Sequence, residues 1–545
     1  MKNIKYIILI TMVLLPFLNS CTDLEEKFFN QVPVSEFGKT QKELDALVGL
    51  IYPGMHVWQL NDPSLLTMTE ISGGMAVIPR RGGDWWDNGS HMEITKHIYD
   101  PNSPMVRYAY ILSSSGTSGF WYTAYNNIAL CNRLYSMIQT SSGDEVLKNK
   151  TLAQIRGIRA FWYYLLVDNF GNVPIVTDFY DTSLPTTTVP GQRKKVYDFI
   201  MAELDTITNL LSPGGPSATY YGKFTKGASF AIRAKMYLNA MVWNPEGGTK
   251  WQECINACDT LLNMGYQLEP NWQTNFIPRN EVSREAIFSS VCKSGDGGNN
   301  VLPFTLHYKS QEALNIWSGP YNGICGMPNY IKDFDTINDI RARMSFLWGP
   351  MISLIDGKQI YTAENRPLIY SIDVPRRNIA DDGWGNAYQE TGARCWKWVP
   401  EPGLSTTMEN DYHIFRISDV YLMKAEALVR RDGGSNGEAT NLVNAIRERA
   451  FPGIPSKLYA SVTLDDIMME RRFELAWEGY ARQDKIRFGH FADPIPGWKD
   501  YEDPIDLNDN PAWFPSGHTH FDLFPIPQGA RNANPNLMQN PGYAQ

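Results

Sequence analysis

Positive charge, cysteine and long apolar runs are all scarce in this chain of 545 residues. The formal net charge is −9, which argues against nucleic acid as a partner, because binding to phosphates requires a basic surface. None of the seven cysteines belongs to a Cys-x-x-Cys pair, so the commonest zinc-site pattern is missing. The apolar run at residues 6–17 is too short and too early to span a membrane.

Motifs of the common enzyme classes are missing as well. The sequence contains no His-Glu-x-x-His, no Gly-x-Ser-x-Gly, no P-loop and no dinucleotide-binding fingerprint, and only eight histidines. We therefore predict that the protein is not an enzyme and uses no cofactor.

What the chain does have is a normal apolar content and many aromatic residues. Hydrophobic residues make up 43% and charged residues 20%, so a large core can form. There are 16 tryptophans and 28 tyrosines. Too many of the tryptophans lie in segments rich in Gly, Asn and Pro for all of them to belong to the core.

The first twenty residues have the pattern of a bacterial lipoprotein signal. Lys2 and Lys5 precede the apolar run, which ends at Leu18-Asn19-Ser20-Cys21. We expect residues 1–20 to be removed and the thiol of Cys21 to carry the lipid. The acidic segment Asp23-Leu-Glu-Glu26 resembles a signal for display on the cell exterior. An ordinary secretory cleavage beside an incidental cysteine is the alternative.

The segment from residue 153 to 170 predicts a bulky aromatic helix at the centre of the fold, joined to a helix at 120–138 through a polar loop at 141–144. Its apolar residues recur at helical spacing, and Trp162 and Leu165 are expected in the core. Gly171 stands where a helix end favours a left-handed residue, and Pro174 prevents any continuation.

Helical periodicity recurs along most of the chain and predicts a mostly α fold of tetratricopeptide-like hairpins. The sequence shows no clean 34-residue repeat. The middle differs, with strand-like fragments and many Gly and Pro at residues 267–410. We divide the mature chain into residues 21–265 and 266–545. The expected helices are 39–52, 120–138, 153–170, 193–211, 226–242, 251–264, 418–431, 438–450 and 463–480.

Two charged or sulfur-containing patterns lie within these helices. Glu470, Glu474 and Glu478 repeat at spacings of four beside several arginines, which indicates either an acidic site or ion pairs on the helix surface. Cys254 and Cys258 would share a helix face, as buried thiols or as a disulfide or metal pair.

Metal sites have weak support. His518, His520 and Asp522 would share one face of an extended segment, although a polar loop is the simpler interpretation. Residues 506–510 imitate the start of a calcium loop, but Pro511 stands where Gly is required. We predict no metal.

The best candidate for ligand binding is a Gly-flanked segment with two adjacent indoles and short polar side chains. A flat aromatic ring matches the apolar face of a sugar, and Asp, Asn and Arg match its hydroxyls. The alternative is a loop that buries its tryptophans to anchor itself. A second aromatic set lies in the middle region. The predicted ligand-binding residues are Arg81, Asp84, Trp85, Trp86, Asn88, Trp317, Tyr321 and Trp384.

An ordered set of motifs gives the chain a family resemblance. They are the lipoprotein start, Trp121 with Tyr125-Asn-Asn-Ile128 and Asn132, the block from Arg159 to Pro174, Arg416 with residues 419–427, residues 446–450 with 470–475, and the tail from Leu523 to Gly542. Together they resemble the SusD/RagB family of outer-membrane nutrient-binding lipoproteins of Bacteroidetes.

The resemblance implies a function. Such a protein would be a helical scaffold on the outer membrane that binds an oligosaccharide, or sometimes a peptide, and delivers it to a SusC-type TonB-dependent transporter for uptake. Two alternatives remain at this point. One is an extracellular all-α glycoside hydrolase, which would need two carboxylates about 5–10 Å apart. The other is a protein-interaction scaffold without a small ligand.

Overall fold

The computed structural model describes most of the chain. It covers residues 38–58, 65–82, 84–85, 89–103, 119–187, 191–293, 298–316, 319–374, 376–377, 386–403, 408–493 and 520–544. Within these ranges, no helix combines the length and apolarity needed to cross a bilayer. The predicted signal segment and Cys21 lie outside them.

Helices dominate the described chain up to residue 262, and they recur near the C-terminus. The first group is α2 (Gln41–Gly49), η3 (Pro53–Trp58), α3 (Leu65–Ser72), α4 (Ser90–Lys96), α6 (Phe120–Thr140), α7 (Glu145–Asn169), α8 (Gln192–Ile207), η5 (Thr208–Leu210), α9 (Lys226–Leu238), α10 (Ala240–Trp243), η6 (Pro245–Gly247) and α11 (Trp251–Leu262). The second is α16 (Ile417–Asp432), α17 (Gly437–Ala450), η9 (Pro455–Lys457), α18 (Leu464–Glu474), α19 (Ala481–Phe488), η12 (His520–Asp522) and α20 (Gln528–Ala533).

The hairpin of α6 and α7 shows how the sequence specifies these elements. In α6 the buried residues follow helical spacing, and the helix ends at Thr140 before a short polar loop. Asp144 then caps α7, because its carboxylate accepts a hydrogen bond from the Leu147 amide at 2.9 Å. Gly171 ends α7 with a φ of +64°, as predicted.

α7 is the central helix. Its residues 161–167 are all buried, with Trp162 and Leu165 among them, so the predicted core position of both is confirmed. A helix buried on every side needs neighbours on every side, and α7 contacts α2, α6, α8 and α9.

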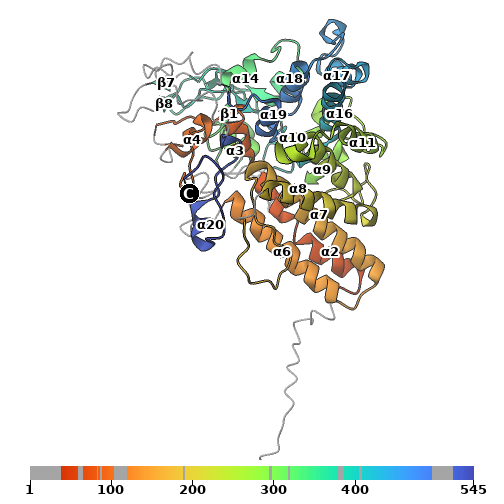
Figure 1. Cartoon of the computed structure of the whole chain (residues 1–545). Helices are drawn as coiled ribbons and strands as arrows, with labels where there is room; N and C mark the ends of the chain where they lie inside the picture. Colours follow the sequence, from red (N-terminus) through yellow and green to blue (C-terminus); the bar gives the residue numbers. More distant parts are fainter. Residues whose placement is uncertain are drawn as a thin grey trace, which may run out of the picture.

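Successive helices pack as neighbours along the scaffold. The contacts run from α6 to α7, α8, α9, α11, α16 and α17, so α11 of the first group packs directly on α16 of the second (Figure 1). This arrangement of antiparallel hairpins confirms the predicted tetratricopeptide-like scaffold.

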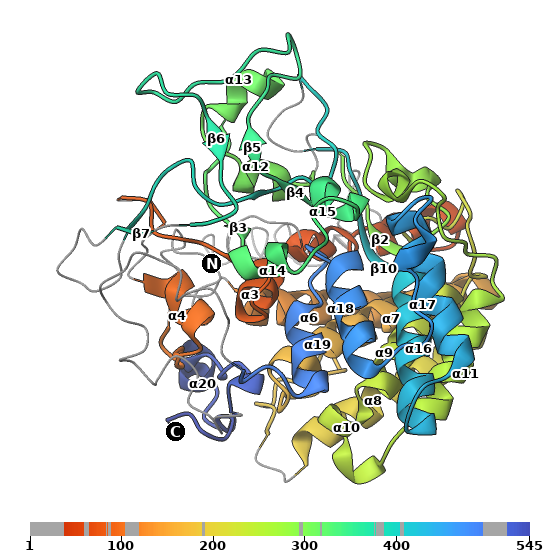
Figure 2. The same cartoon turned by 90° about the horizontal axis from the view of Figure 1, so that it is seen from above.

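The segment between the two helical groups contains short strands and short helices. In Figure 2 the part that carries α12, α13, β5 and β6 lies above the helical body. Its members are β2 (Ala286–Ser290), α12 (Val301–Thr305), α13 (Ser310–Leu314), β3 (Cys325–Gly326), α14 (Pro328–Lys332), α15 (Ile340–Ser345), β4 (Phe346–Leu347), β5 (Gly349–Pro350), β6 (Ile369–Tyr370), β7 (Arg376–Arg377), β8 (Asn386–Ala387) and β9 (Arg394–Cys395).

All the sheets in the described residues are two-stranded. The antiparallel pairs are β1 (Ala76–Val77) with β3, β4 with β9, β5 with β6, β7 with β8, and β2 with β10 (Tyr412–Arg416). Two of these pairs join distant parts of the chain: β1 of the N-terminal region pairs with β3 of the middle segment, and β2 of the middle segment pairs with β10 just before α16.

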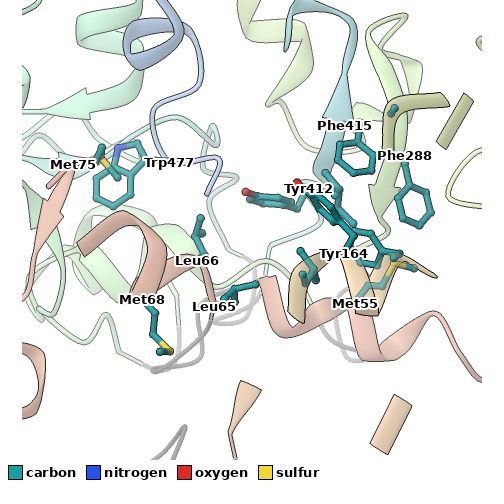
Figure 3. Packing of buried hydrophobic residues seen from close by; sticks show 14 of the residues in the cluster. Met55, Leu65, Leu66, Met68, Met75, Tyr164, Phe288, Tyr412, Phe415 and Trp477 are labelled. Carbon is teal, nitrogen blue, oxygen red and sulfur yellow. The ribbon is translucent and has the colours of Figure 1, made fainter. Parts of the chain in front are cut away.

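Aromatic residues fill the core where the β2–β10 pair meets the central helix. Phe288 of β2 and Phe415 of β10 stack with their ring centroids 6.4 Å apart, and Tyr164 of α7 lies 6.1 Å from Phe415 (Figure 3). Offset and edge-to-face contacts at these distances add to the burial of apolar area.

The C-terminal tail packs against the C-terminal end of α7. Asn540 donates hydrogen bonds through its side-chain amide to the carbonyl oxygens of Phe170 and Phe524, both at 2.8 Å. Tyr99 and Phe524 pack with ring centroids 5.1 Å apart. Two of the motifs recognised in the sequence, the end of α7 and the Leu523–Gly542 tail, are therefore parts of one contact.

The charged motifs of the C-terminal helices form a buried ion-pair network. Glu474 accepts hydrogen bonds from Arg341, Arg416 and Arg449, and all of these side chains are largely or fully buried. The ion-pair interpretation is therefore confirmed, but the predicted surface position is wrong. The arginines come from α15, β10 and α17, so these glutamates pair with elements packed over α18.

The prediction of one helix over residues 463–480 is also wrong. The capping box of Thr463 and Asp466 begins α18 as expected, but the helix ends at Glu474. Trp477 has a φ of +66°, and its indole N–H donates to the carbonyl of Ser345 at 3.1 Å. These tertiary contacts outweigh helical periodicity, and the chain continues into α19. Cys254 and Cys258 are free and buried, as predicted.

Candidate functional site

The predicted ligand loop contains a tight turn at residues 81–84. The amides of Arg81 and Asp84 donate to each other's carbonyl oxygens at 3.0 and 3.1 Å. Gly82, with a φ of +69°, supplies the left-handed conformation that the turn requires. Trp85 also has a positive φ of +58°, which is unusual for a bulky residue and must be stabilised by its contacts.

The indole of Trp85 is fixed by the middle region of the chain. Its N–H donates to the carbonyl of Tyr321 at 2.8 Å, and its ring meets Phe304 edge-on with centroids 4.9 Å apart. A Cβ at Gly323 would lie 3.1 Å from the indole, so glycine allows this close approach. The ring is half-buried and keeps part of its surface open.

Asp84 is exposed and paired with a tyrosine. The hydroxyl of Tyr308 donates to Asp84 Oδ2 at 2.7 Å, and the Tyr308 side chain is 41% exposed. Burial raises the pKa of Tyr308, and the hydrogen bond to Asp84 together with its negative charge raises it further. The pair therefore presents a carboxylate and a neutral phenol at the surface.

Tyr321, Asn322 and Gln389 link three loops beside this pair. Tyr321 is 46% exposed, and its amide donates to the carbonyl of Pro303 at 3.0 Å. The side-chain amide of Asn322 donates to Gln389 Oε1, and Gln389 Nε2 donates to the carbonyl of Arg81 at 3.2 Å. Tyr388, next to Gln389, is also exposed.

Arg81 supports the loop from the interior. Its side chain is 0% exposed, and one guanidinium nitrogen donates to the carbonyl of Thr391 at 2.8 Å. Burial lowers the pKa of Arg81 to about 9, and the neighbouring Arg394 lowers it too. The sequence interpretation placed Arg81 among the ligand contacts. In the structure its buried side chain donates to backbone carbonyls behind the loop and so fixes their positions.

Loops from distant parts of the chain thus meet here, and they carry aromatic rings and polar groups that are at least partly exposed. We call Asp84, Trp85, Tyr308, Tyr321 and Tyr388 the Trp85 site. Its neighbour His307 has a pKa lowered to about 4, by burial first and then by Arg394 and Arg81, so this imidazole is neutral at physiological pH. The site therefore combines aromatic rings with a carboxylate and phenolic hydroxyl groups.

Sequence reasoning found part of this site. It selected Asp84, Trp85 and Tyr321, which the structure brings together, but missed Tyr308 and Tyr388. Each is a single tyrosine in the middle region, so the only available signal was the aromatic content of that region. The predicted contacts Trp86, Asn88, Trp317 and Trp384 lie outside the described residues.

Among the described residues, no group of three or more His, Cys, Asp or Glu side chains is arranged to hold a metal. The calcium-like segment 506–517 and His518 lie outside the described residues.

Comparisons with known proteins match both halves of the chain to one family. Residues 84–238 match a family model described as "Starch-binding associating with outer membrane", and residues 373–543 match the "SusD family" model. The starch-binding protein SusD of Bacteroides thetaiotaomicron is 24% identical, over 84% of this chain and 82% of that protein. SusD-like protein P2 of Formosa agariphila is 25% identical, over 97% of this chain and 98% of that protein.

Solved structures share the fold over nearly the whole chain. A laminarin binding SusD-like protein superposes with a TM-score of 0.68 at 22% identity, covering 93% of this chain and 100% of that one. Surface glycan-binding protein A from Bacteroides thetaiotaomicron, in complex with laminarihexaose, superposes with a TM-score of 0.68 at 20% identity, covering 92% of this chain and 99% of that one. The ordered motifs, the two family models and the shared fold agree: this chain is a member of the SusD family of Bacteroidetes.

Proposed function

We propose that the protein binds an oligosaccharide at the Trp85 site and acts as a binding protein, not as an enzyme. The observation that carries this proposal is the half-buried indole of Trp85, fixed edge-on by Phe304 and by the Tyr321 carbonyl, with exposed tyrosines around it. A ring fixed in this way loses little conformational entropy when a sugar stacks on it.

The polar groups of the site suit the rim of a sugar ring. Asp84 accepts hydrogen bonds from hydroxyls, and the Tyr308 hydroxyl, already oriented by Asp84, can accept one more. Aromatic faces combined with a few fixed polar groups are typical of small-ligand sites. Relatives and structural neighbours described as binding starch, laminarin or laminarihexaose support the same class of ligand.

The cellular role follows from the N-terminal pattern and the family. We propose that Cys21 carries the lipid anchor, that the protein is exposed on the outer membrane, and that it delivers its oligosaccharide to a SusC-type TonB-dependent transporter. The lipoprotein pattern of residues 1–21 supports the anchor. The family model named for association with the outer membrane supports the location.

Calorimetry with a panel of oligosaccharides tests the ligand site. Trp85→Ala should cost about 1–3 kcal/mol of binding free energy, the range for a ring at the centre of a ligand contact. Tyr321→Ala should weaken binding less. Trp251→Ala, which removes a half-buried indole from α11, is the matched control and should bind like the parent.

Two outcomes would contradict the proposal. If Trp85→Ala melts normally and binds every ligand as tightly as the parent, the stacking platform lies elsewhere. If the parent releases reducing ends from a bound glycan, the glycoside hydrolase alternative replaces the pure binding function.

A further inference from the structure

A cavity lies on a different part of the molecule from the Trp85 site and shares no residue with it. It has a volume of about 310 Å³ and opens between α2, η3, the loop at residues 221–223 and the chain that follows β2. This volume is at the lower end of the range for small-ligand sites, so it suits one ring rather than a chain of rings. We call it the α2–β2 cavity.

Tyrosine rings on two sides of the cavity are fixed by hydrogen bonds. The hydroxyl of Tyr52 accepts from the Phe224 amide at 3.0 Å and donates to Gln154 Oε1 at 3.2 Å. The hydroxyl of Tyr221 donates to Asp411 Oδ2 at 2.6 Å. With Met55 and Val291, these rings make an apolar wall that matches the C–H face of a sugar ring.

Two of the donors that line the cavity form no hydrogen bond within the described residues. Because Gln154 Oε1 already accepts from Tyr52, its side-chain nitrogen is the group left over, and it forms no hydrogen bond there. Lys293 also lines the cavity and forms neither a hydrogen bond nor an ion pair within the described chain. Both groups are at least partly open to solvent, so they are available to donate to the acceptors of a ligand that lies against the apolar wall.

The charges at the mouth favour an anion. Among the lining residues, Lys223 and Lys293 face one carboxylate, Asp45, and the Lys223–Asp45 pair is 4.0 Å apart with both side chains about half exposed to solvent. Asp411 lies behind Tyr221, where the Tyr221 hydroxyl and the Cys292 amide donate to it. A pair this long and this exposed contributes little, so both ammonium groups remain able to bind a ligand. His56 contributes a ring whose Nε2 is engaged by the Val291 carbonyl at 2.8 Å.

We propose that the α2–β2 cavity binds a single sugar residue that carries a carboxylate, a hexuronate. Its ring lies against Tyr52 and Val291, its hydroxyls accept from Gln154, and its carboxylate pairs with Lys293. This site is independent of the oligosaccharide site at Trp85.

The test compares two sugars that differ at one carbon. D-glucuronate and D-glucose, together with acetate as the bare anion, are titrated into the full mature protein by calorimetry or ligand-observed NMR. Glucuronate should bind about tenfold or more tightly than either of the others, because the ring contacts and the charged hydrogen bonds act together.

Two variants locate the binding. Lys293→Gln should weaken glucuronate about tenfold, the usual size of a lost hydrogen bond to a charged group. Gly49→Phe should abolish it by filling the cavity; Gly49 lines the cavity in a helical conformation, and an added Cβ there meets nothing within 4 Å, so this variant should fold. Lys195→Gln, an exposed lysine on α8, is the charge control, and Trp85→Ala should leave glucuronate binding unchanged.

Several results would overturn the proposal: no glucuronate binding up to its solubility limit, equal binding of glucose or acetate, or unchanged binding in Gly49→Phe. Glucuronate binding that is lost in Trp85→Ala but kept in Gly49→Phe would assign the sugar acid to the Trp85 site instead. Loss of neutral oligosaccharide binding in Trp85→Ala tests the other proposal, so the two can fail separately.

Discussion

Arg81 holds the Trp85 loop from behind through hydrogen bonds to backbone carbonyls. A guanidinium is suited to this role, since its planar group carries several donors in a fixed geometry. In the described residues its acceptors are the carbonyls of Tyr388, Gln389 and Thr391, the Thr391 hydroxyl and the thiol of Cys325, and none is a carboxylate. The loop thus depends on a cation in the interior, and the sequence Arg80-Arg81 alone does not reveal which arginine faces inward.

Glu70 on α3 is a buried carboxyl whose protonation should affect stability. Its side chain is 1% exposed, and it accepts a hydrogen bond from the Gly479 amide. Burial raises the pKa of Glu70 to about 8. Below about pH 4.5, Glu70 is protonated in both the folded and the unfolded protein. Above that pH it ionises first in the unfolded protein, so the free energy of unfolding falls as pH rises, and the full loss is reached above pH 8.

Glu70→Gln should remove this dependence, because an amide does not ionise. Denaturant unfolding at pH 5, 7 and 8.5 should show a free energy of unfolding that depends less on pH in the variant. Across that range the change in this free energy should differ between parent and variant by an amount on the order of a few kcal/mol. Glu448→Gln, at an exposed position on α17, should keep the parent's profile. Parallel profiles for Glu70→Gln and the parent would show that Glu70 ionises normally in the folded state.

The packing of the central helix sets a second test, at Gly157. Glycine in a helix normally costs about 1 kcal/mol relative to alanine. Here a Cβ at residue 157 would lie 2.3 Å from the ring of Phe224, so glycine allows the loop before α9 to pack against α7. Gly157→Ala should therefore destabilise the protein, by about 1–3 kcal/mol for an overpacked core.

Gly49→Ala is the matched control for Gly157→Ala. Gly49 is also helical, but an added Cβ there meets nothing within 4 Å, so this variant should be as stable as the parent or more stable. Thermal melts of both variants decide the matter. If Gly157→Ala melts at or above the parent's temperature, the higher helix propensity of alanine outweighs the steric conflict, and the Phe224 ring moves without loss of stability.

The elements that sequence reasoning predicted well are amphipathic helices with clear ends, such as α6 and α7. It missed α3, whose eight residues are all buried, because a helix buried on every side shows no contrast between two faces. It also extended α18 through Trp477, where the left-handed backbone is fixed by the Ser345 carbonyl, a partner 132 residues away. Periodicity describes local preference and contains no information about such partners.

The candidate site was predictable to a similar degree. Trp85 and Asp84 were visible because two indoles in a Gly-flanked segment are unusual. Their partner Tyr308 lies 224 residues along the chain from Asp84, so only the fold brings the two together. Arg81 differs: its residue type suggested ligand contact, whereas its side chain is buried by contacts with residues that lie 244 to 310 positions away along the chain.

The buried ion pairs connect distant segments of the whole molecule. Glu285 precedes β2, Arg416 ends β10, Arg449 lies in the last turn of α17 and Glu474 ends α18. Their side chains form one network. Removing one partner of a buried pair leaves uncompensated charge in the interior, which costs about 3–5 kcal/mol. Glu474→Ala should therefore destabilise all these segments together, in one calorimetric transition.

The network should also make stability sensitive to acid. Burial alone would raise the pKa of Glu474, but Arg449, Arg416 and Arg341 outweigh it and hold the pKa below its ordinary value. The stabilisation that the ionised Glu474 provides is present above about pH 4.5 and is lost as pH falls towards the lowered pKa. Between pH 7 and pH 3 the melting temperature should fall more steeply for the parent than for Glu474→Ala. The control Glu253→Ala removes a half-exposed carboxylate and should behave like the parent. Equal slopes would contradict this role.

The attachment of the whole molecule to a membrane is predicted to depend on Cys21, which lies outside the described residues. One acyl chain binds a bilayer only marginally, whereas several chains on one cysteine give stable anchoring. Cys21→Ala should therefore release the protein from the outer-membrane fraction or leave its signal uncleaved, with oligosaccharide affinity unchanged. Fractionation, the mass of the N-terminal peptide and calorimetry measure the three effects. Thr22→Ala, which keeps the cysteine, should stay with the membrane. If Cys21→Ala is processed normally and fractionates with the parent, the cysteine is incidental and the segment is an ordinary secretory signal.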